Sequence, residues 1–253
     1  MLSQSKIKYI RSLSNKKFRI QYRQFIVEGT KSVKELLNSN YIADSIYATK
    51  DWINNHSDSS VKINPIEISE NEMGKISQLT TPQNVLGIFN IPDISINNLS
   101  LSGALTLMLD DIKDPGNMGT IIRIADWFGI KQIICSPKSV DIYNPKVVQG
   151  SMGSIARVNV AYANLLDILQ NKSENIPVYG ALLDGENIYK TTLESSGIII
   201  IGNESEGISE NLLPHISKKI MIPSFNTNLQ KAESLNAAIA AGIICAEFRR
   251  RAI

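Results

Sequence analysis

Residues 198–207 read Ile-Ile-Ile-Ile-Gly-Asn-Glu-Ser-Glu-Gly, in which four consecutive isoleucines run into an acidic turn between two glycines. A continuous apolar run of this kind is typical of a strand that is buried on both faces of a parallel sheet. Ser209 and Glu210 then provide the residue types with which a helix can begin. The stretch therefore predicts an α/β fold with a loop at the carboxyl end of a central strand.

Other apolar runs in the second half of the chain predict further strands with helices between them. They span Leu105–Leu109, Gln132–Cys135, Arg157–Ala161, Val178–Leu183 and Ile220–Ile222. This pattern predicts a mostly parallel sheet covered by helices, in which ligands bind at the carboxyl ends of the strands. A polar turn after a strand can also be a plain surface connection.

Another polar segment follows the strand predicted at Leu105–Leu109. Asp114-Pro115-Gly116 has the chemistry of a turn, and Asn117 is a good cap for a helix that runs to Phe128 before Gly129. Arg123 lies about 1.7 turns beyond Asn117 on that helix. A helix start with a fixed cation nearby suits a phosphodiester. The alternative is a capped helix whose arginine forms a structural ion pair.

The last strand leads into a third segment. Ile220–Pro223 is followed by a polar loop at 224–233, and Ser234-Leu235-Asn236 opens an Ala-rich helix that runs to Arg251. The small residues of this helix predict close packing, which by itself indicates a tight helix interface and nothing more.

The first 90 residues alternate shorter strands and helices. Strands are predicted at Phe25–Val27, Ser45–Ala48, Ile63–Ile68 and Val85–Asn90, and a helix capped by Thr30 follows the first of them. Pro, Ser and Asn residues after Ile91 read as a linker. We therefore expect a domain at residues 1–91, a linker at 92–103 and a second domain at 104–253.

Positive charge is concentrated at the beginning of the chain. The net charge is only +2, but residues 1–31 carry eight Lys or Arg and a single acidic residue, Glu28. Such a segment suits a polyanion, and Lys16, Lys17, Arg19 and Arg23 are the predicted contacts to its anionic groups. The alternative is that these side chains only solvate the outer face of a first helix.

The remaining composition excludes several classes of protein. Cys135 and Cys245 lie in apolar stretches, and His56 and His215 have no partner at ligand spacing, so no metal site is predicted. No dinucleotide-binding or P-loop glycine motif is present. The N-terminus is too polar for a signal peptide and no apolar run is long enough to cross a bilayer, so we expect a cytoplasmic protein without a membrane partner.

Taken together, the three segments resemble the motifs of the SpoU (TrmH) family of the SPOUT superfamily, whose members transfer a methyl group from S-adenosylmethionine to a ribose 2′-hydroxyl of RNA. The resemblance implies a trefoil-knotted α/β domain, S-adenosyl-L-methionine as the cofactor, RNA rather than DNA as the partner, and a homodimer. It covers about 150 residues. One departure is the loop at 224–233, which in family members is often shorter and contains glycine, so the assignment of Ser234 is less secure than that of Asn236.

The resemblance also implies roles for individual residues. Gly202, Ile222 and Leu235 would contact the cofactor, with Asn203, Gly207 and Asn236 around it. Arg123 would activate the ribose hydroxyl, supported by Asn117, Glu204, Ser234 and Asn236. Since the pKa of arginine lies above about 12, stabilisation of the developing alkoxide is an equally open role for Arg123.

The N-terminal region resembles the L30e-like substrate-binding domain of ribosomal RNA methyltransferases, through Phe25–Gly29 and Val85–Ile88. A domain of this kind favours 23S ribosomal RNA as the substrate. The alternatives are a transfer RNA 2′-O-methyltransferase and a non-catalytic RNA-binding relative.

Overall fold

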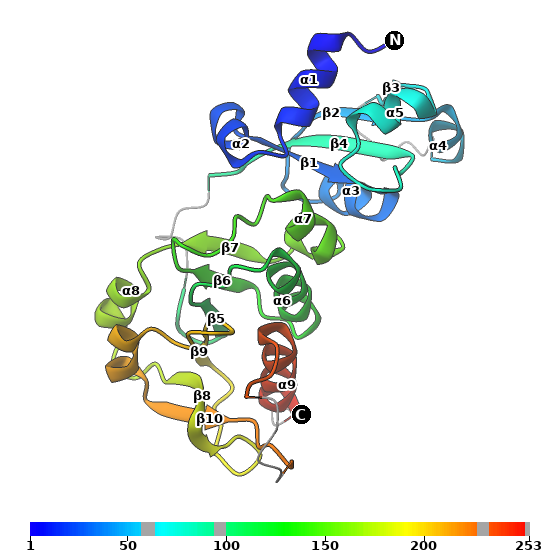
Figure 1. The fold of residues 1–253 in the computed structure, drawn as a ribbon. Coiled ribbons are helices and arrows are strands. Elements are labelled where there is room, and N and C mark those ends of the chain that lie inside the picture. The colour runs from blue at the N-terminus through cyan, green and yellow to red at the C-terminus, as the bar shows by residue number, and fades with distance from the viewer. Residues whose placement is uncertain (57–63, 94–99, 227–232, 251–253) are drawn as a thin grey trace. The chain divides into compact units, whose positions relative to one another are not determined.

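The computed structural model describes residues 1–56, 64–93, 100–226 and 233–250, and the chain forms two compact units (Figure 1). Unit 1 comprises Met1–Asp93 and Asp141–Ala156, and unit 2 comprises Ile94–Val140 and Arg157–Ile253. The sequence does not indicate that residues 141–156 group with the first unit. The domain boundaries near residues 91 and 104 stay a prediction.

Unit 1 contains a four-stranded sheet of order β1-β4-β2-β3. The strands β1 (Gln24–Glu28) and β2 (Ala43–Ala48) both pair antiparallel with β4 (Val85–Asn90), while β3 (Ile66–Glu67) pairs parallel with β2. The helices of this unit are α1 (Gln4–Ser12), α2 (Lys16–Tyr22), α3 (Thr30–Leu37), α4 (Lys50–Asn55), α5 (Glu70–Ile76), α7 (Pro145–Ser151) and the short η2 (Ser154–Ala156).

The predicted strands of unit 1 are confirmed, with small changes at their ends. Val85–Asn90 has the predicted bounds, whereas the third strand covers only Ile66–Glu67 of the predicted Ile63–Ile68, and Ile63 lies outside the described residues. Gly29, not Thr30, occupies the cap of α3. Its φ of 92° is a value that glycine adopts readily and other residues rarely do, which allows the chain to turn sharply from β1 into the helix.

Unit 2 is built on a six-stranded sheet of order β10-β8-β9-β5-β6-β7, in which every neighbouring pair is parallel. This confirms the predicted parallel sheet. Its strands are β5 (Leu105–Leu109), β6 (Gln132–Cys135), β7 (Asn159–Tyr162), β8 (Val178–Asn187), β9 (Gly197–Ile201) and β10 (Lys218–Met221). Its helices are α6 (Pro115–Trp127), α8 (Leu165–Asn171), η3 (Glu210–His215) and α9 (Ala237–Arg250).

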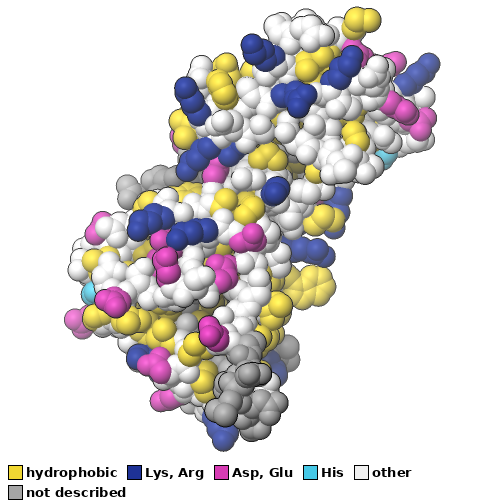
Figure 2. Space-filling view, in the orientation of Figure 1, with side chains coloured by type: hydrophobic (Ala, Val, Ile, Leu, Met, Phe, Trp, Pro, Cys, Tyr) yellow, Lys and Arg dark blue, Asp and Glu magenta, His cyan; other side chains and the backbone are white. Residues whose placement is uncertain are grey.

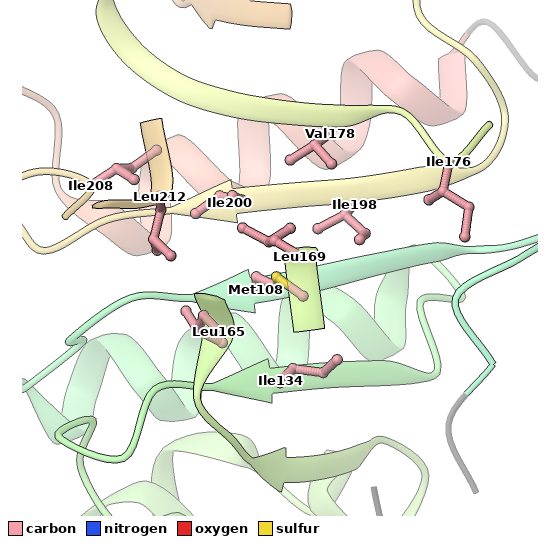
Figure 3. Close-up of a cluster of buried hydrophobic side chains, with 10 residues drawn as sticks. All are labelled: Met108, Ile134, Leu165, Leu169, Ile176, Val178, Ile198, Ile200, Ile208 and Leu212. Atoms are coloured by element: carbon pink, nitrogen blue, oxygen red, sulfur yellow. The ribbon is translucent and has the colours of Figure 1, made fainter. Parts of the chain in front are cut away.

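Both faces of this sheet are covered. On one face, side chains from four strands pack against α8 and η3, and α6 and α9 lie behind the sheet in the same view (Figure 3). All five residues of β9 are buried, which explains why that strand carries an uninterrupted apolar run. The residues of this cluster are Met108, Ile134, Leu165, Leu169, Ile176, Val178, Ile198, Ile200, Ile208 and Leu212.

Three local predictions in unit 2 need correction. Asp114 caps α6 by accepting a hydrogen bond from the backbone N–H of Asn117 at 2.8 Å, so Asn117 lies in the first turn and is not the cap. The helix after Ser209 is a 3-10 helix with Pro214 inside it. The strand predicted at Arg157–Ala161 begins later, at Asn159. The trefoil knot stays a prediction.

The helices of the described ranges are all too short or too polar to cross a membrane.

Candidate functional site

Three loops meet at the carboxyl edge of the unit 2 sheet. They follow β5, β9 and β10, and the first and third lead into the starts of α6 and α9. These helices run side by side in the same direction, since Asn236 at the start of α9 bonds to Asn117 on α6, and Arg249 near its end donates to the carbonyl of Phe128. Distant segments of sequence therefore converge on one place.

A pocket of about 500 Å³ opens between the loops after β9 and β10. Its walls also include the middle of β8, the last residues of β9 and β10, and one side of α9. The residues that line it are Ala181–Asp184, Ile201–Gly207, Ile220–Ile222, Ser234, Leu235, Ala237, Ala240 and Ile244.

The turn at 202–207 forms one wall of the pocket and is closed on itself. Asn203 and Gly207 exchange two backbone hydrogen bonds of 2.9 Å each, and the Asn203 side-chain oxygen accepts from the N–H groups of Ser205 and Glu206. A Cβ atom on Gly202 would lie 2.3 Å from the carbonyl carbon of Gly207. The turn thus requires a glycine at 202.

Two aspartates just after β5, one through its carboxylate and one through its backbone carbonyl, anchor the turn and the segment that follows it. The buried Asp110 accepts a hydrogen bond of 2.7 Å from the N–H of Ser209, and the Asn203 side chain donates to the carbonyl of Asp111 at 2.8 Å. Asp111 has a φ of 54°, and the Ser136 hydroxyl bonds to both its N–H and its carboxylate. The first loop is therefore fixed and in turn fixes the second.

A chain of side-chain hydrogen bonds joins all three loops. Asn117 donates to Glu204, and Asn236 donates to the Asn117 side-chain oxygen at 2.8 Å. The side-chain oxygen of Asn236 accepts hydrogen bonds from the backbone N–H groups of Ala238 and Ile239, which caps α9. Three of the polar residues predicted for the site, Asn117, Glu204 and Asn236, are thus joined by hydrogen bonds, and each asparagine side chain is held through both its nitrogen and its oxygen.

The pocket is apolar with an acidic rim. Asp184, Glu204 and Glu206 contribute carboxylates, and none of its lining residues in the described ranges is Lys or Arg. A hydrogen bond of 2.8 Å from Lys219 lowers the pKa of Asp184, and Lys113 lies 3.6 Å from Glu206. With these two lysines beside them, the three carboxylates leave a small excess of negative charge, which together with the apolar walls favours a ligand that has an apolar part and a positive charge.

Arg123 lies outside the pocket, on the exposed side of α6. In the ranges that the structure describes, no hydrogen bond or ion pair engages its guanidinium group, so the structural ion pair considered as an alternative does not form there. The side chain is free to contact a ligand that extends beyond the pocket.

Most predicted cofactor residues line the pocket. The predicted site residues that line it are Gly202, Asn203, Glu204, Gly207, Ile222, Ser234 and Leu235. Asn117 and Asn236 do not line it but are hydrogen-bonded to each other, and Asn117 also bonds to Glu204. The wall at Ala181–Asp184 was not predicted. The only signal for this wall was its place at the end of the strand predicted at Val178–Leu183.

The predicted RNA contacts in unit 1 divide into two groups. Lys16 and Lys17 are exposed, and Arg23 is exposed with Asp93 at 2.5 Å. Arg19 is only 2% exposed, pairs with Asp141 at 2.6 Å and donates to the carbonyls of Leu13 and Ser14. The prediction that Arg19 contacts RNA is therefore corrected: its charge is already neutralised inside unit 1.

Residues 104–246 match a family model described as the SpoU rRNA Methylase family. The chain belongs to this family. Residues 4–87 match a second model, described as the MRM3-like substrate binding domain. Both matches confirm the resemblance inferred from the three motifs and from the N-terminal strands.

SpoU relatives cover the whole chain. The 23S rRNA (guanosine(2553)-2′-O)-methyltransferase RlmP of Bacillus subtilis is 30% identical over 96% of each chain. A solved TrmH-family protein from Porphyromonas gingivalis aligns with a TM-score of 0.88 and 38% identity over 99% of each chain. An AdoMet-bound rRNA methyltransferase from Sinorhizobium meliloti aligns with a TM-score of 0.87 and 28% identity, over 100% of this chain and 98% of that one.

Among the described residues, no three His, Cys, Asp or Glu side chains come together as a metal site.

Proposed function

We propose that this SpoU protein methylates a ribose 2′-hydroxyl of 23S ribosomal RNA, with S-adenosylmethionine as the methyl donor. The observation that carries the proposal is the acidic-rimmed pocket formed by the second and third motifs, beside a helix that presents an exposed arginine. RlmP, which resembles this chain along its whole length, is named for that reaction on 23S rRNA. The cytoplasm is the proposed site of action.

The residues of the pocket fit S-adenosylmethionine. Its adenine ring is flat and largely apolar, and Ile201, Ile222 and Leu235 offer apolar walls. Its sulfonium and amino groups are positively charged, which suits Asp184, Glu204 and Glu206 and would oppose a phosphorylated cofactor. When bound, the molecule supplies an electrophilic methyl group.

The polar residues of the site have separable tasks in this proposal. Asn117, Glu204 and Asn236 hold the three loops in one arrangement, so they position the pocket wall against the start of α6. Since a ribose hydroxyl is a weak nucleophile at neutral pH, it must be held in line with the methyl group and stabilised as its proton leaves. Arg123 has two possible roles at this step. Its charge would bind the neighbouring phosphate and stabilise the alkoxide, or the side chain, in its neutral form, would accept the proton.

Methyl transfer in vitro tests the function. Purified protein, S-adenosylmethionine with a labelled methyl group, and separate samples of 23S rRNA and bulk transfer RNA are incubated, and the 2′-O-methylated nucleotides are mapped by their resistance to alkaline cleavage. Methylation of 23S rRNA at a discrete site is expected. Methylation of transfer RNA alone would establish the first alternative, and RNA binding without any transfer would establish a non-catalytic protein.

We also propose that the protein is a homodimer. Trp127 on α6 is 84% exposed, and Ile239 and Leu235 at the start of α9 are 56% and 47% exposed, so these paired helices present apolar side chains to solvent. Ile244 and Phe248 of the same helix are buried within unit 2 and do not contribute to this surface. Exposed apolar groups on a helix pair are typical of a symmetric contact.

Light scattering at micromolar concentration should give twice the 28.0 kDa mass of a single chain. Trp127→Glu should shift the mass toward one chain, because it places a charge among desolvated apolar groups. Ile42→Glu, at a side chain of unit 1 that is 68% exposed, serves as the matched control and should leave the mass unchanged. A wild-type mass of 28 kDa would refute the dimer.

The exposed lysines of α2 are proposed to bind phosphates of the RNA. Replacing Lys16 and Lys17 with Ala should weaken binding to a 23S rRNA fragment. The slope of the logarithm of the binding constant against the logarithm of the salt concentration should become less steep by about 0.7–0.9 for each phosphate that the variant no longer neutralises. The affinity for S-adenosylmethionine should not change. An unchanged salt slope in titrations at several ionic strengths would show that these lysines only solvate the helix.

A further inference from the structure

Three aromatic side chains gather where α1 meets α2 in unit 1. The rings of Phe18 and Tyr22, one turn apart on α2, are stacked with an interplanar angle of 13° and a centroid separation of 6.3 Å. Tyr9 of α1 meets Tyr22 edge to face, with centroids 5.1 Å apart. Each contact is a favoured aromatic arrangement, so the cluster has a defined geometry.

The cluster is only partly covered. Tyr9 and Phe18 are half-buried, but Tyr22 at the end of the row is 41% exposed, so part of this residue reaches solvent. Tyr22 is therefore the member of the cluster that is most accessible to a ligand.

The two helices that carry these rings also carry exposed positive charge. Lys16 and Lys17 are exposed on α2, Lys8 and Arg11 are exposed on α1, and the ammonium group of Lys6 lies 4.8 Å from the centre of the Tyr9 ring. In Figure 2, Lys and Arg side chains alternate with hydrophobic ones over α1 and α2, while acidic side chains are scarce on that part of the visible face. This distribution fits a ligand that combines flat rings with negative charge.

Buried contacts hold α2 in place beneath this surface. Arg19 donates to the carbonyls of Leu13 and Ser14 at 2.9 and 2.7 Å and pairs with Asp141, and the hydroxyl of Tyr9 donates to the Gln24 side chain. Arg23 ends α2 in the left-handed region, with a φ of 53°. The rings are therefore preorganised, which reduces the entropy lost when a ligand binds them.

We propose that Tyr22, supported by Phe18 and Tyr9, is a stacking site for an unpaired nucleobase of the RNA substrate, with Lys16 and Lys17 holding the flanking phosphates. This inference rests on the proposed function and specifies which form of RNA unit 1 selects. Single strands, loops and bulges offer free base faces to aromatic side chains, whereas the bases of a duplex are already stacked on one another. The Tyr22 site therefore discriminates single-stranded RNA from duplex RNA.

The test compares the wild type with Tyr22→Ala and Tyr22→Phe. Each is titrated, by fluorescence anisotropy, with a single-stranded RNA of about 12 nucleotides, within the range of known site sizes, and with a duplex of the same length. Tyr22→Ala should weaken binding to the single strand roughly 10-fold, as expected when one base is no longer stacked, and change duplex binding little. Tyr22→Phe keeps the ring and should bind as the wild type does.

A second readout reports stacking of the base directly and can be made on the wild type alone. A 2-aminopurine base in the single strand should lose fluorescence on binding the wild type, because stacking quenches it, and should be quenched less by Tyr22→Ala. Equal weakening toward single strand and duplex, or an unchanged affinity of Tyr22→Ala for the single strand, would overturn the stacking site.

The methyl-transfer assay separates this inference from the proposed function. If the wild type methylates 23S rRNA normally and Tyr22→Ala binds the single-stranded RNA as tightly as the wild type does, the stacking site is refuted and the proposed function stands. A wild type that binds neither RNA would overturn the stacking site, and absence of methyl transfer to any RNA tested would overturn the proposed catalytic function.

Discussion

Gly202→Val is expected to lower the affinity of the protein for S-adenosylmethionine at least 100-fold, about 2.7 kcal/mol of binding free energy. Even the first atom of a side chain at this position would lie 2.3 Å from the backbone of Gly207, and backbone cannot rotate out of the way as a flexible side chain can. The turn that forms one wall of the pocket must therefore open. Isothermal titration calorimetry with S-adenosylmethionine or S-adenosylhomocysteine measures the loss.

A substitution at a second glycine, where a side chain has room, serves as the control for Gly202→Val. Gly242→Ala on α9 places its new carbon 3.5 Å from Ile124, an ordinary contact, and alanine is the better helix former. This variant should bind the cofactor as the wild type does. RNA binding through unit 1 and thermal unfolding show whether Gly202→Val is folded. Unchanged cofactor affinity in a folded Gly202→Val, or no binding by the wild type, would remove the cofactor role of this turn.

The sequence predicted the sheet well because its signals are local. Four isoleucines at 198–201 identify a strand buried on both faces, and β6 and β4 have the predicted bounds. Capping was harder to predict, since Asp114 and Asn117 are both good cap residues and only three positions apart. The structure selects Asp114, which leaves the Asn117 side chain free to bond with Glu204 and Asn236.

The parts of the site that sequence could not predict depend on contacts between distant segments. Asp184 has no motif, and it joins the pocket only because β8 lies between β9 and β10 in the sheet. Arg19 looked like one more cation in a basic segment, and its burial depends on Asp141, which is 122 residues away along the chain. A count of charges along the sequence cannot separate such a structural arginine from the exposed Lys16 and Lys17.

The contrast between Arg19 and Arg123 follows from their partners. Arg19 forms its hydrogen bonds and ion pair inside unit 1, so its removal leaves the buried Leu13 carbonyl without a donor and should affect stability. Arg123 is exposed and has no such partner in the described ranges, so its removal should leave the fold intact. A large loss of activity at Arg123 would therefore reflect chemistry.

Arg123→Ala is expected to lower the single-turnover rate of methyl transfer roughly 100-fold or more, the scale seen when a group that acts mainly in the transition state is removed. Arg123 is six residues along α6 from Asn117, or about 9 Å along the helix axis, and its charge is exposed. Cofactor binding and most of the RNA affinity should remain. The reaction is measured with 23S rRNA at saturating S-adenosylmethionine, and Thr120→Ala on the same exposed side of α6 is the control.

The kinetics of two variants distinguish the possible roles of this arginine. A near-normal rate for Arg123→Ala would refute a catalytic role, and recovery of its rate at higher RNA concentration alone would make Arg123 a binding residue. The pH dependence of Arg123→Lys separates the two chemical roles. Because lysine keeps the positive charge at neutral pH but loses its proton more readily than arginine, substantial activity that does not rise with pH indicates electrostatic stabilisation of the alkoxide, whereas activity that rises steeply with pH indicates a proton acceptor. If Arg123→Lys is as slow as Arg123→Ala throughout, the planar guanidinium group is required to bind the phosphate beside the ribose through two parallel hydrogen bonds.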